Sequence, residues 1–533
     1  MQKAWRAFLV GILFIFLGFA AAQKTLIVAV EGDIDTFDPA FSVGSTPTQT
    51  ISVNVFETLI RPNIVERAAR DGTVYRAVDM EQLVGQLAES WDFDPNNPNR
   101  VIFRLRKGVR YHSGTPFNAD AVILGMRRIF ESQSITTFLV GMGGAVTSAD
   151  LFRKLDDYTV VLTMKQGNLL TLKNLTIYNS AAIDPADLKA HATPKDPWAL
   201  DWFKKNLGSG TGPYLLESYV PGDRIVLKAY PNYYLGKPKI DRVIMKIVPD
   251  PAQRVLLLRT GAVDMANQVP VRELDALKRI PSLRVLSLPT TNQDRLMMNN
   301  GIPPFDSKLV RQAVAYAIPY ELIVQQVYRG YARVPAGPIE DGMPTSDPTA
   351  WPYRYDPERA KKLLAEAGYP GGRGISTIKL SIRIGNAEHE REAVIVQDAL
   401  SKIGIKVAIE KLPFATFNEL QQGGKLQFFI DDWISWVNDP YYHMFWNFHS
   451  KSPTNYVRYS NPEVDKIIDT YMLRRDAKAR AEASQRAQRL ISNDVPQVYL
   501  ASPNFNVVLN KKVTGYIYFN DQLTRFFYMD KEP

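Results

Sequence analysis

Hydrophobic and polar positions repeat with two different periods along this chain, and the two patterns alternate from one segment to the next. Residues 101–105 alternate between apolar and polar side chains, which predicts a strand. Residues 310–317 carry apolar side chains at the spacing i, i+3, i+4 and i+7. This spacing predicts a helix that begins after Ser307 and ends before Pro319. The alternation of the two kinds of element indicates a layered α/β architecture.

Residues that begin and end helices support the same architecture. Asp356 offers a capping carboxylate, Pro357 suits the first helical position, and Gly368 can end the helix that they begin. A near-continuous apolar run over residues 243–248 predicts a buried strand.

The first residues have the composition of a secretory signal peptide. Lys3 and Arg6 precede a charge-free run over residues 7–22 that ends in three alanines. A basic start, a short apolar core and small residues at the end are what such a peptide requires. We expect residues 1–22 to be removed before Gln23; an uncleaved anchor helix is the alternative. The run is slightly shorter than the about 20 residues that span a bilayer.

The chain contains no cysteine. Stability therefore has to come from core burial rather than from disulfides, and no N-terminal cysteine is present to carry a lipid. We expect a free periplasmic protein that is not a lipoprotein.

The charge balance is mildly basic, at a formal +9 from 64 Lys and Arg against 55 Asp and Glu. The charges are interspersed, which is typical of a solvated surface, so we expect no nucleic-acid partner. Aromatic residues make up 11% of the chain, with 25 Tyr and 8 Trp. Most belong in the core, but Trp and Tyr also suit a ligand-binding cleft because each combines an apolar face with a polar tip.

The motifs of common enzyme classes do not occur in the sequence. It has no G-x-S-x-G elbow, H-E-x-x-H, P-loop or EF-hand loop. The glycine-dense segment 208–213 lacks the Lys and Ser/Thr of a phosphate loop and predicts a tight turn with a close approach of the backbone instead. His443 and His449 are six residues apart, a poor spacing for a shared metal. We expect no catalytic residue, metal or cofactor; an exported hydrolase is the enzyme alternative.

The segment Arg104–Asp120, RLRKGVRYHSGTPFNAD, closely resembles a signature of the family 5 extracellular solute-binding proteins. These are the peptide- and nickel-type binding components of ABC importers. Ser113 stands where the family usually has Asp. Further blocks match in the family's order: Asp35–Pro39, Leu87–Trp91, Gly210–Tyr214, Asn232–Pro238 and Val310–Ala317. The resemblance covers nearly the whole mature chain.

The resemblance implies a periplasmic-binding-protein-like fold of the type II or cluster C kind. Two α/β lobes would close on a ligand about a hinge of two crossing segments, and an extra subdomain would enlarge the first lobe. The expected first lobe comprises residues 23–63, 184–295 and 497–533. The expected extra subdomain covers residues 64–183, and the second lobe covers residues 296–496.

The resemblance also implies a function. The protein would capture a solute between its lobes and deliver it to an ABC permease in the cytoplasmic membrane, and we expect it to do so as a monomer. A di- or oligopeptide is the first expectation for the ligand. An oligosaccharide or another ring-bearing solute is the second, and a metal chelate is the third. A peptide-holding chaperone is an alternative of a different class.

One stretch, residues 431–445, carries most of the expected ligand contacts. In peptide-binding members of the family, an Asp four residues before the Pro that matches Pro440 holds the peptide ammonium. Here Trp436 occupies that position. A Trp offers only a π-face, worth about 0.5–2 kcal/mol to a cation. Asp439 or Asp432 is a candidate substitute for the missing carboxylate. Trp433 and Asn438 complete the expected contacts of this stretch.

The resemblance places three further ligand contacts elsewhere in the chain. Arg391 lies where dipeptide-binding members have an arginine for the ligand carboxylate, although a solvated helix-face arginine is the alternative. Thr36 and Phe37 lie at the end of the first strand of the first lobe, where the family meets its ligand.

Overall fold

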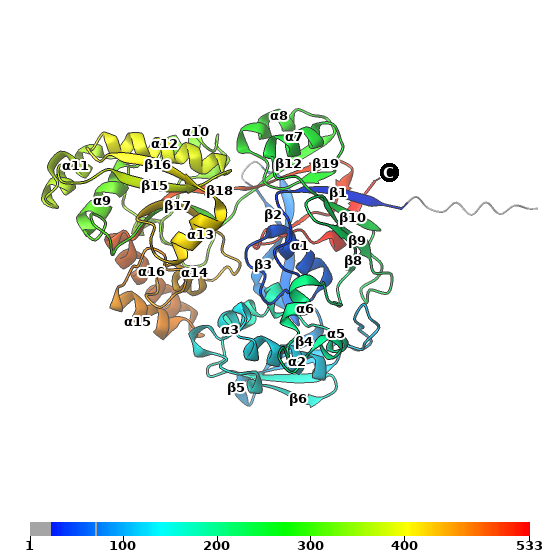
Figure 1. Ribbon diagram of the computed structural model, residues 1–533. Coiled ribbons are helices and arrows are strands. Elements are labelled where there is room, and N and C mark those ends of the chain that lie inside the picture. The colour runs from blue at the N-terminus through cyan, green and yellow to red at the C-terminus, as the bar shows by residue number, and fades with distance from the viewer. Residues whose placement is uncertain (1–22, 70–71, 533) are drawn as a thin grey trace, which may run out of the picture.

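The computed structural model describes residues 23–69 and 72–532. The expected signal peptide lies outside these residues. Among the described helices, none is long and apolar enough to cross a membrane. Two lobes and a third region of smaller sheets make up the molecule (Figure 1).

The first lobe is built on a seven-stranded mixed sheet. Its central strand β1 pairs in parallel with β10 and β11, and the edges are antiparallel. In spatial order the strands are β12 (Leu283–Leu288), β19 (Phe505–Asn510), β11 (Met265–Ala266), β1 (Thr25–Val30), β10 (Arg242–Ile247), β9 (Arg224–Ala229) and β8 (Tyr214–Val220). The same lobe carries α1 (Thr46–Val55), α7 (Pro251–Arg259) and α8 (Leu274–Lys278).

The second lobe is built on a six-stranded sheet with helices packed around it. The strands are β14 (Ala332–Arg333), β18 (Gln497–Pro503), β13 (Gln293–Met298), β17 (Phe428–Trp433), β15 (Ile378–Arg383) and β16 (Val407–Leu412). The helices are α9 (Lys308–Ala317), α10 (Tyr320–Gln326), α11 (Pro357–Glu366), α12 (Ala387–Ser401), α13 (Phe414–Gln422), α14 (Pro440–Phe448), α15 (Pro462–Tyr471) and α16 (Ala477–Asp494).

The extra region contains a twisted hairpin and a separate four-stranded sheet. The hairpin strands β2 (Ile60–Ala68) and β3 (Val74–Gly85) are joined by β21 (Ile517–Tyr518) from the C-terminal segment. The four-stranded sheet is β4 (Ala88–Asp94), β5 (Asn97–Leu105), β7 (Thr159–Thr163) and β6 (Phe152–Asp156). Its helices are α2 (Ala119–Glu131), α3 (Ile135–Val140), α4 (Leu169–Asn174), α5 (Pro185–His191) and α6 (Leu200–Lys205). The remaining short strands are β20 (Val513–Thr514) and β22 (Asp530–Lys531).

Two short segments cross between the lobes. Residues 289–292 join β12 to β13, and Asn504 joins β18 to β19. The Thr290 hydroxyl donates to the Pro503 carbonyl at 2.7 Å, so the two crossings are hydrogen-bonded to each other. This geometry is that of a hinge, in which a few residues absorb a change in the angle between the lobes.

The two-lobe α/β fold is confirmed, but some expected boundaries are misplaced. Strand β18, assigned to the first lobe, pairs with β13 in the second-lobe sheet, because the chain completes that sheet before crossing. The second lobe therefore runs from about Gln293 to Pro503. Helices α5 and α6 share an apolar cluster with Leu124 of α2, so the extra region extends past residue 183.

The predicted elements that rest on local signals are confirmed. Helix α11 begins at Pro357, and the Asp356 carboxylate accepts a hydrogen bond from the Arg359 backbone N–H at 2.9 Å. Helix α9 begins directly after Ser307 and ends at Ala317. The glycine-dense turn packs against backbone: a Cβ at Gly210 would lie 1.7 Å from a carbonyl oxygen of α1, which no side chain tolerates.

Candidate ligand-binding cleft

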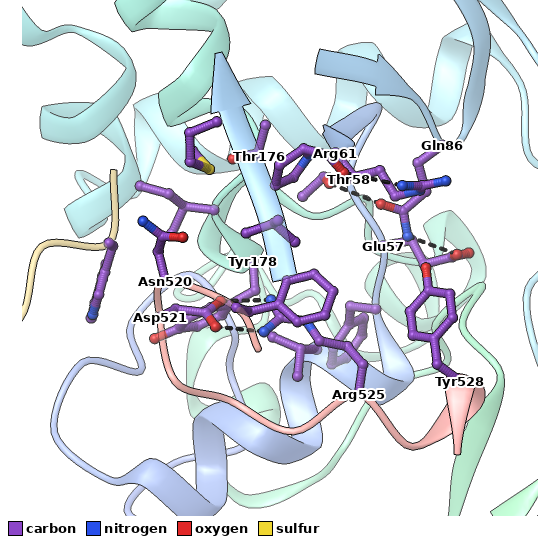
Figure 2. Close-up of a pocket in the computed structure, with 18 residues that line it drawn as sticks. Glu57, Thr58, Arg61, Gln86, Thr176, Tyr178, Asn520, Asp521, Arg525 and Tyr528 are labelled. Atoms are coloured by element: carbon purple, nitrogen blue, oxygen red, sulfur yellow. Dashed lines mark hydrogen bonds and ion pairs between the residues drawn. The ribbon is translucent and has the colours of Figure 1, made fainter. Parts of the chain in front are cut away.

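A cavity between the lobes contains about 690 Å³ of space free of protein atoms, part of which is open to solvent. We call it the Trp cavity, because Trp436 is the residue that the second lobe contributes. The other walls come from the end of α1, the hairpin β2–β3, the segment after α4 and the C-terminal loop. Its polar lining residues, labelled in Figure 2, are Glu57, Thr58, Arg61, Gln86, Thr176, Tyr178, Asn520, Asp521, Arg525 and Tyr528.

Trp436 meets an aromatic partner across the cleft. Its ring centroid lies 6.0 Å from that of Tyr178, with the planes inclined by 53°. The Tyr178 hydroxyl donates to the Ser42 carbonyl at 2.5 Å. Burial, reinforced by the negative charge of Asp521, raises the pKa of Tyr178 above its ordinary value, so the phenol stays neutral. The half-buried Trp436 indole thus presents a ring surface to the cavity from the second lobe, opposite the Tyr178 ring.

The two acids of the Trp cavity are already occupied. Asp521 accepts two hydrogen bonds from Arg525, at 2.5 and 2.6 Å, in a bidentate pair. Glu57 is buried, and burial raises its pKa. Its carboxyl oxygens accept from four side chains at 2.7–3.0 Å: Gln86, Tyr233, Tyr234 and Thr211.

The arginine Arg61, by contrast, has no acidic partner within salt-bridge distance among the described residues, and its guanidinium donates only to the Pro62 carbonyl, at 3.0 Å. Within the part of the chain that the structure describes, the Trp cavity thus offers a spare cation and no free carboxylate.

A second pocket of about 580 Å³ adjoins the first beside the hinge. We call it the hinge pocket. It shares Val78, Met80 and Asn520 with the Trp cavity, so the two form neighbouring parts of one cleft. The predicted contact Asn438 lines it, with its amide oxygen buried and without a hydrogen-bond partner among the described residues. The structure therefore brings Trp436 and Asn438 to the same cleft.

Asp439 lies outside both pockets, and its carboxylate is already engaged. It caps α14, where its carboxylate accepts from the Tyr441 backbone N–H at 2.9 Å. Both carboxylate oxygens also accept from Arg480, each at 2.9 Å. Asp432 is not free either, because Arg383 pairs with Asp431 and reaches Asp432 at 3.4 Å. Neither candidate substitute presents an unpaired carboxylate to a ligand ammonium.

Trp433, Thr36 and Phe37 line neither pocket. Trp433 ends β17 and lies under the Arg295 guanidinium, 5.5 Å from its ring centre. The Phe37 ring is buried edge-on against Tyr219, with the centroids 5.6 Å apart. The Thr36 hydroxyl accepts from the backbone of Asp38 at 3.2 Å, which shapes the turn after β1. As ligand contacts these three residues stay predictions.

Arg391 lies on α12 and lines a separate surface depression together with Arg272 and Lys411. The structure does not bring it together with Trp436 or Asn438. Its role toward a ligand carboxylate likewise stays a prediction.

One buried group of side chains has the composition of a metal site. The candidate ligand atoms of Asp294, His389 and Glu392 lie within 4.8 Å of one another. Burial opposes a charge on His389, but the Asp294 carboxylate, 3.8 Å from Nε2, outweighs it and raises the pKa of His389 to about 9. A doubly protonated imidazole has no lone pair for a metal. The Tyr328 hydroxyl donates to Asp294 and lies 3.2 Å from Glu392, which links the group into a buried network.

Several cleft residues carry no signal in the sequence. Tyr178 belongs to the extra region, while Asn520, Asp521 and Arg525 belong to a C-terminal loop more than 300 residues away. No periodicity or motif joins these segments. The strand pairing of β21 with β3 places the C-terminal loop beside the hairpin.

Comparison with known proteins gives a consistent result. A family model described as bacterial extracellular solute-binding proteins, family 5 Middle, matches residues 82–456. The probable D,D-dipeptide-binding periplasmic protein DdpA of Escherichia coli (strain K12) is 30% identical over 521 residues. The match covers 95% of this chain and 94% of that protein.

Solved structures share the fold. The periplasmic binding protein DppA from Helicobacter pylori, in complex with the peptide STSA, superposes with a TM-score of 0.83 at 24% identity, over 96% of this chain and 98% of that one. MoaA from A. tumefaciens R10, in complex with mannopinic acid, gives a TM-score of 0.81 at 22% identity, over 96% of this chain and all of that one. At these identities the likeness concerns architecture alone.

Proposed function

Because this chain belongs to family 5 of the bacterial extracellular solute-binding proteins, we propose that it is a peptide-binding component of an ABC importer. The mature protein works in the periplasm as a free monomer, after removal of residues 1–22. It captures a di- or oligopeptide between its lobes and presents it to a membrane permease. It catalyses no reaction.

The observation that carries the proposal is the contact of Trp436 with Tyr178 across the Trp cavity. The two rings come from opposite sides of the cleft, so a ligand between the lobes touches both sides only when they close. Ligand binding then shifts the population toward the closed state, which is the form that a permease can recognise. The E. coli relative, a probable D,D-dipeptide-binding protein, supports a peptide as the solute.

Native mass spectrometry of the purified mature protein, before and after denaturation, tests this function. We expect release of peptides at one per protein molecule, and their masses define the accepted length. If nothing co-purifies, a thermal-shift screen with di- to pentapeptides follows. A protein that releases no peptide and is stabilised by none in that screen contradicts the proposal.

A ring-bearing carbohydrate is the second candidate, and the side chain at position 436 favours it. An indole in place of a carboxylate stacks well on a sugar ring, and the described residues of the Trp cavity supply no free carboxylate for an ammonium. Hexose-spaced masses released on denaturation would support this candidate over a peptide.

A further inference from the structure

The hinge pocket has an unusual charge for a small, partly enclosed space. Arg67 from β2 and Arg333 from β14 both line it, one from each side of the cleft. Asp341 is the acid in the lining; it is exposed, and no salt bridge joins it to either arginine among the described residues. The pocket therefore carries two positive charges against one solvated negative charge.

Both guanidinium groups keep donors to spare. An arginine has five N–H donors. Within the described part of the chain, Arg67 donates to the Val78 carbonyl at 3.4 Å, and Arg333 donates to the hinge carbonyl of Thr290 at 2.5 Å. The Nε of Arg333 is buried and has no hydrogen-bond partner there. An unsatisfied buried donor is costly unless a ligand or water fills its place.

The two arginines act on a common point in the pocket. Burial raises the pKa of Tyr75, and the positive charges of Arg67 and Arg333 both oppose that rise. Tyr75 lines the hinge pocket together with the two arginines, so both positive charges act within the same pocket. Like charges held this way repel each other when the lobes approach, and an anion between them removes that repulsion.

We propose that the hinge pocket is an anion subsite, in which Arg67 and Arg333 together hold a carboxylate of the captured solute. The inference rests on the proposed function and specifies its ligand: a peptide whose carboxylate lies beside the hinge and whose apolar body lies against Trp436. The free amide oxygen of Asn438 accepts an N–H of the same ligand. Guanidinium groups suit this task because their N–H donors match both oxygens of a carboxylate.

With this assignment, the negative charge of the ligand contributes to closure of the two lobes. Because one arginine belongs to each side of the cleft, an acid bridges the lobes and an uncharged analogue does not. The Trp cavity provides no free carboxylate for an ammonium among its described residues. Binding should therefore depend strongly on the acid of the ligand and weakly on its amine.

Isothermal titration with alanyl-alanine, as the D,D and the L,L form, tests the subsite. Each is used as free acid, C-terminal amide and N-acetylated acid. We expect the amide to bind about tenfold to hundredfold more weakly than the acid, and acetylation to change affinity by less than about threefold. The acid-to-amide ratio is the affinity for the free acid divided by the affinity for the amide. Arg333→Gln and Arg67→Gln should each reduce this ratio toward one, and Arg333→Lys should give an intermediate ratio. The exposed Arg279→Gln is the matched control and should leave the ratio unchanged.

Two results overturn the subsite: an unchanged acid-to-amide ratio in both Gln variants, or an equal affinity of the wild type for acid and amide. If the acid-to-amide ratio falls to one only in Arg391→Gln, the ligand carboxylate binds at Arg391 on α12 and not in the hinge pocket. Failure of the peptide function is recognised separately. If mannopinic acid binds, no peptide does, and Arg333→Gln abolishes that binding, the peptide proposal fails while the anion subsite stands. If neither peptides nor mannopinic acid bind, both fail.

Discussion

The Nζ of Lys173 lies 3.7 Å from Oδ2 of Asp439, and both side chains are almost completely buried. Lys173 belongs to α4 of the extra region, whereas Asp439 begins α14 of the second lobe. Burial alone would raise the pKa of Asp439, but the charges of Arg480 and Lys173 outweigh it and lower that pKa. The aspartate expected at the ligand is instead part of an ion pair that spans the cleft.

Lys173→Gln should shift the protein toward its open form. The substitution removes a buried attraction between the two sides, together with the 2.7 Å pair of Lys173 with Glu81, and leaves Asp439 paired with Arg480. We expect peptide affinity to fall by about fivefold to thirtyfold, equivalent to about 1–2 kcal/mol, and the radius of gyration of the empty protein to increase. Small-angle scattering and calorimetry measure the two effects. Lys189→Gln, on the exposed end of α5, is the control and should change neither. Unchanged scattering and affinity in Lys173→Gln would mean that the pair does not hold the lobes together.

Trp436→Asp should change the charge preference of the Trp cavity. A carboxylate at this position faces a space in which Asp521 is paired with Arg525 and Glu57 is hydrogen-bonded to neutral side chains. We expect a dipeptide with a free amine to bind about tenfold more tightly than to the wild type, because the ammonium gains a counter-charge. The N-acetylated dipeptide and the native ligand should bind more weakly, because they lose the ring face.

Trp436→Phe distinguishes the effect of the aromatic ring from the effect of the added charge in the same experiment. It keeps an aromatic surface and should not improve binding of the free amine. Equal changes for free and acetylated dipeptide in Trp436→Asp would show that position 436 does not contact the ligand's amino end.

The sequence predicts best what local chemistry decides. The capped start of α11 at Asp356 and the close approach at Gly210 follow from the residues at those positions and are confirmed. The resemblance to the family places the loop of Trp436 and Asn438 at the cleft, and both residues line its pockets, although their contact with a ligand stays a prediction. Each of these predictions needs only neighbouring residues or a known pattern.

The remaining features depend on contacts between distant segments. The loop sequence alone makes Asp439 a candidate ligand contact. The structure places Arg480 and Lys173 beside it, and the loop sequence does not reveal either of these partners. Arg333 shows the reverse case, since an arginine in a two-residue edge strand has no motif, yet the fold brings it to the hinge pocket. Which charges are neutralised and which are spare is decided by tertiary structure.

The buried pair of Asp38 and Arg128 should be essential for stability. Arg128 on α2 contacts Asp38, in the turn after β1, through two hydrogen bonds, and both side chains are almost completely buried. Arg128 also donates to the Trp198 carbonyl at 3.1 Å. Asp38→Asn leaves an uncompensated buried guanidinium, so the free energy of unfolding should fall by about 3–5 kcal/mol.

Urea denaturation followed by circular dichroism measures this loss. The neighbouring Arg127 supplies a matched control, because it forms an exposed pair with Glu131 at 3.2 Å. Glu131→Gln should change the free energy of unfolding by less than about 1 kcal/mol. A loss of the same small size in Asp38→Asn would mean that the buried guanidinium finds another partner.

Glu340 should make the stability of the second lobe depend on pH near neutrality. The carboxyl group is buried beside the hinge, where Gln293 donates to it at 3.1 Å, and burial raises its pKa to about 7 from 4.5. The unfolded chain releases this proton near the ordinary value, but the folded protein keeps it until about pH 7. Stability from this group is therefore fully present below about pH 4.5 and is lost as the pH rises through 7.

Glu340→Gln removes the titration while keeping an acceptor for Gln293. Relative to the wild type, the variant should gain stability as the pH is raised from about 5 to 8, by up to about 3 kcal/mol. Urea denaturation at several pH values in this range measures the difference, with the exposed Glu366→Gln as control. A difference between variant and wild type that is constant over this range would show that Glu340 is already ionised in the folded protein at pH 5. In that case the nearby Arg333 would hold it as a carboxylate, and the positive charge of the hinge pocket would be reduced by one.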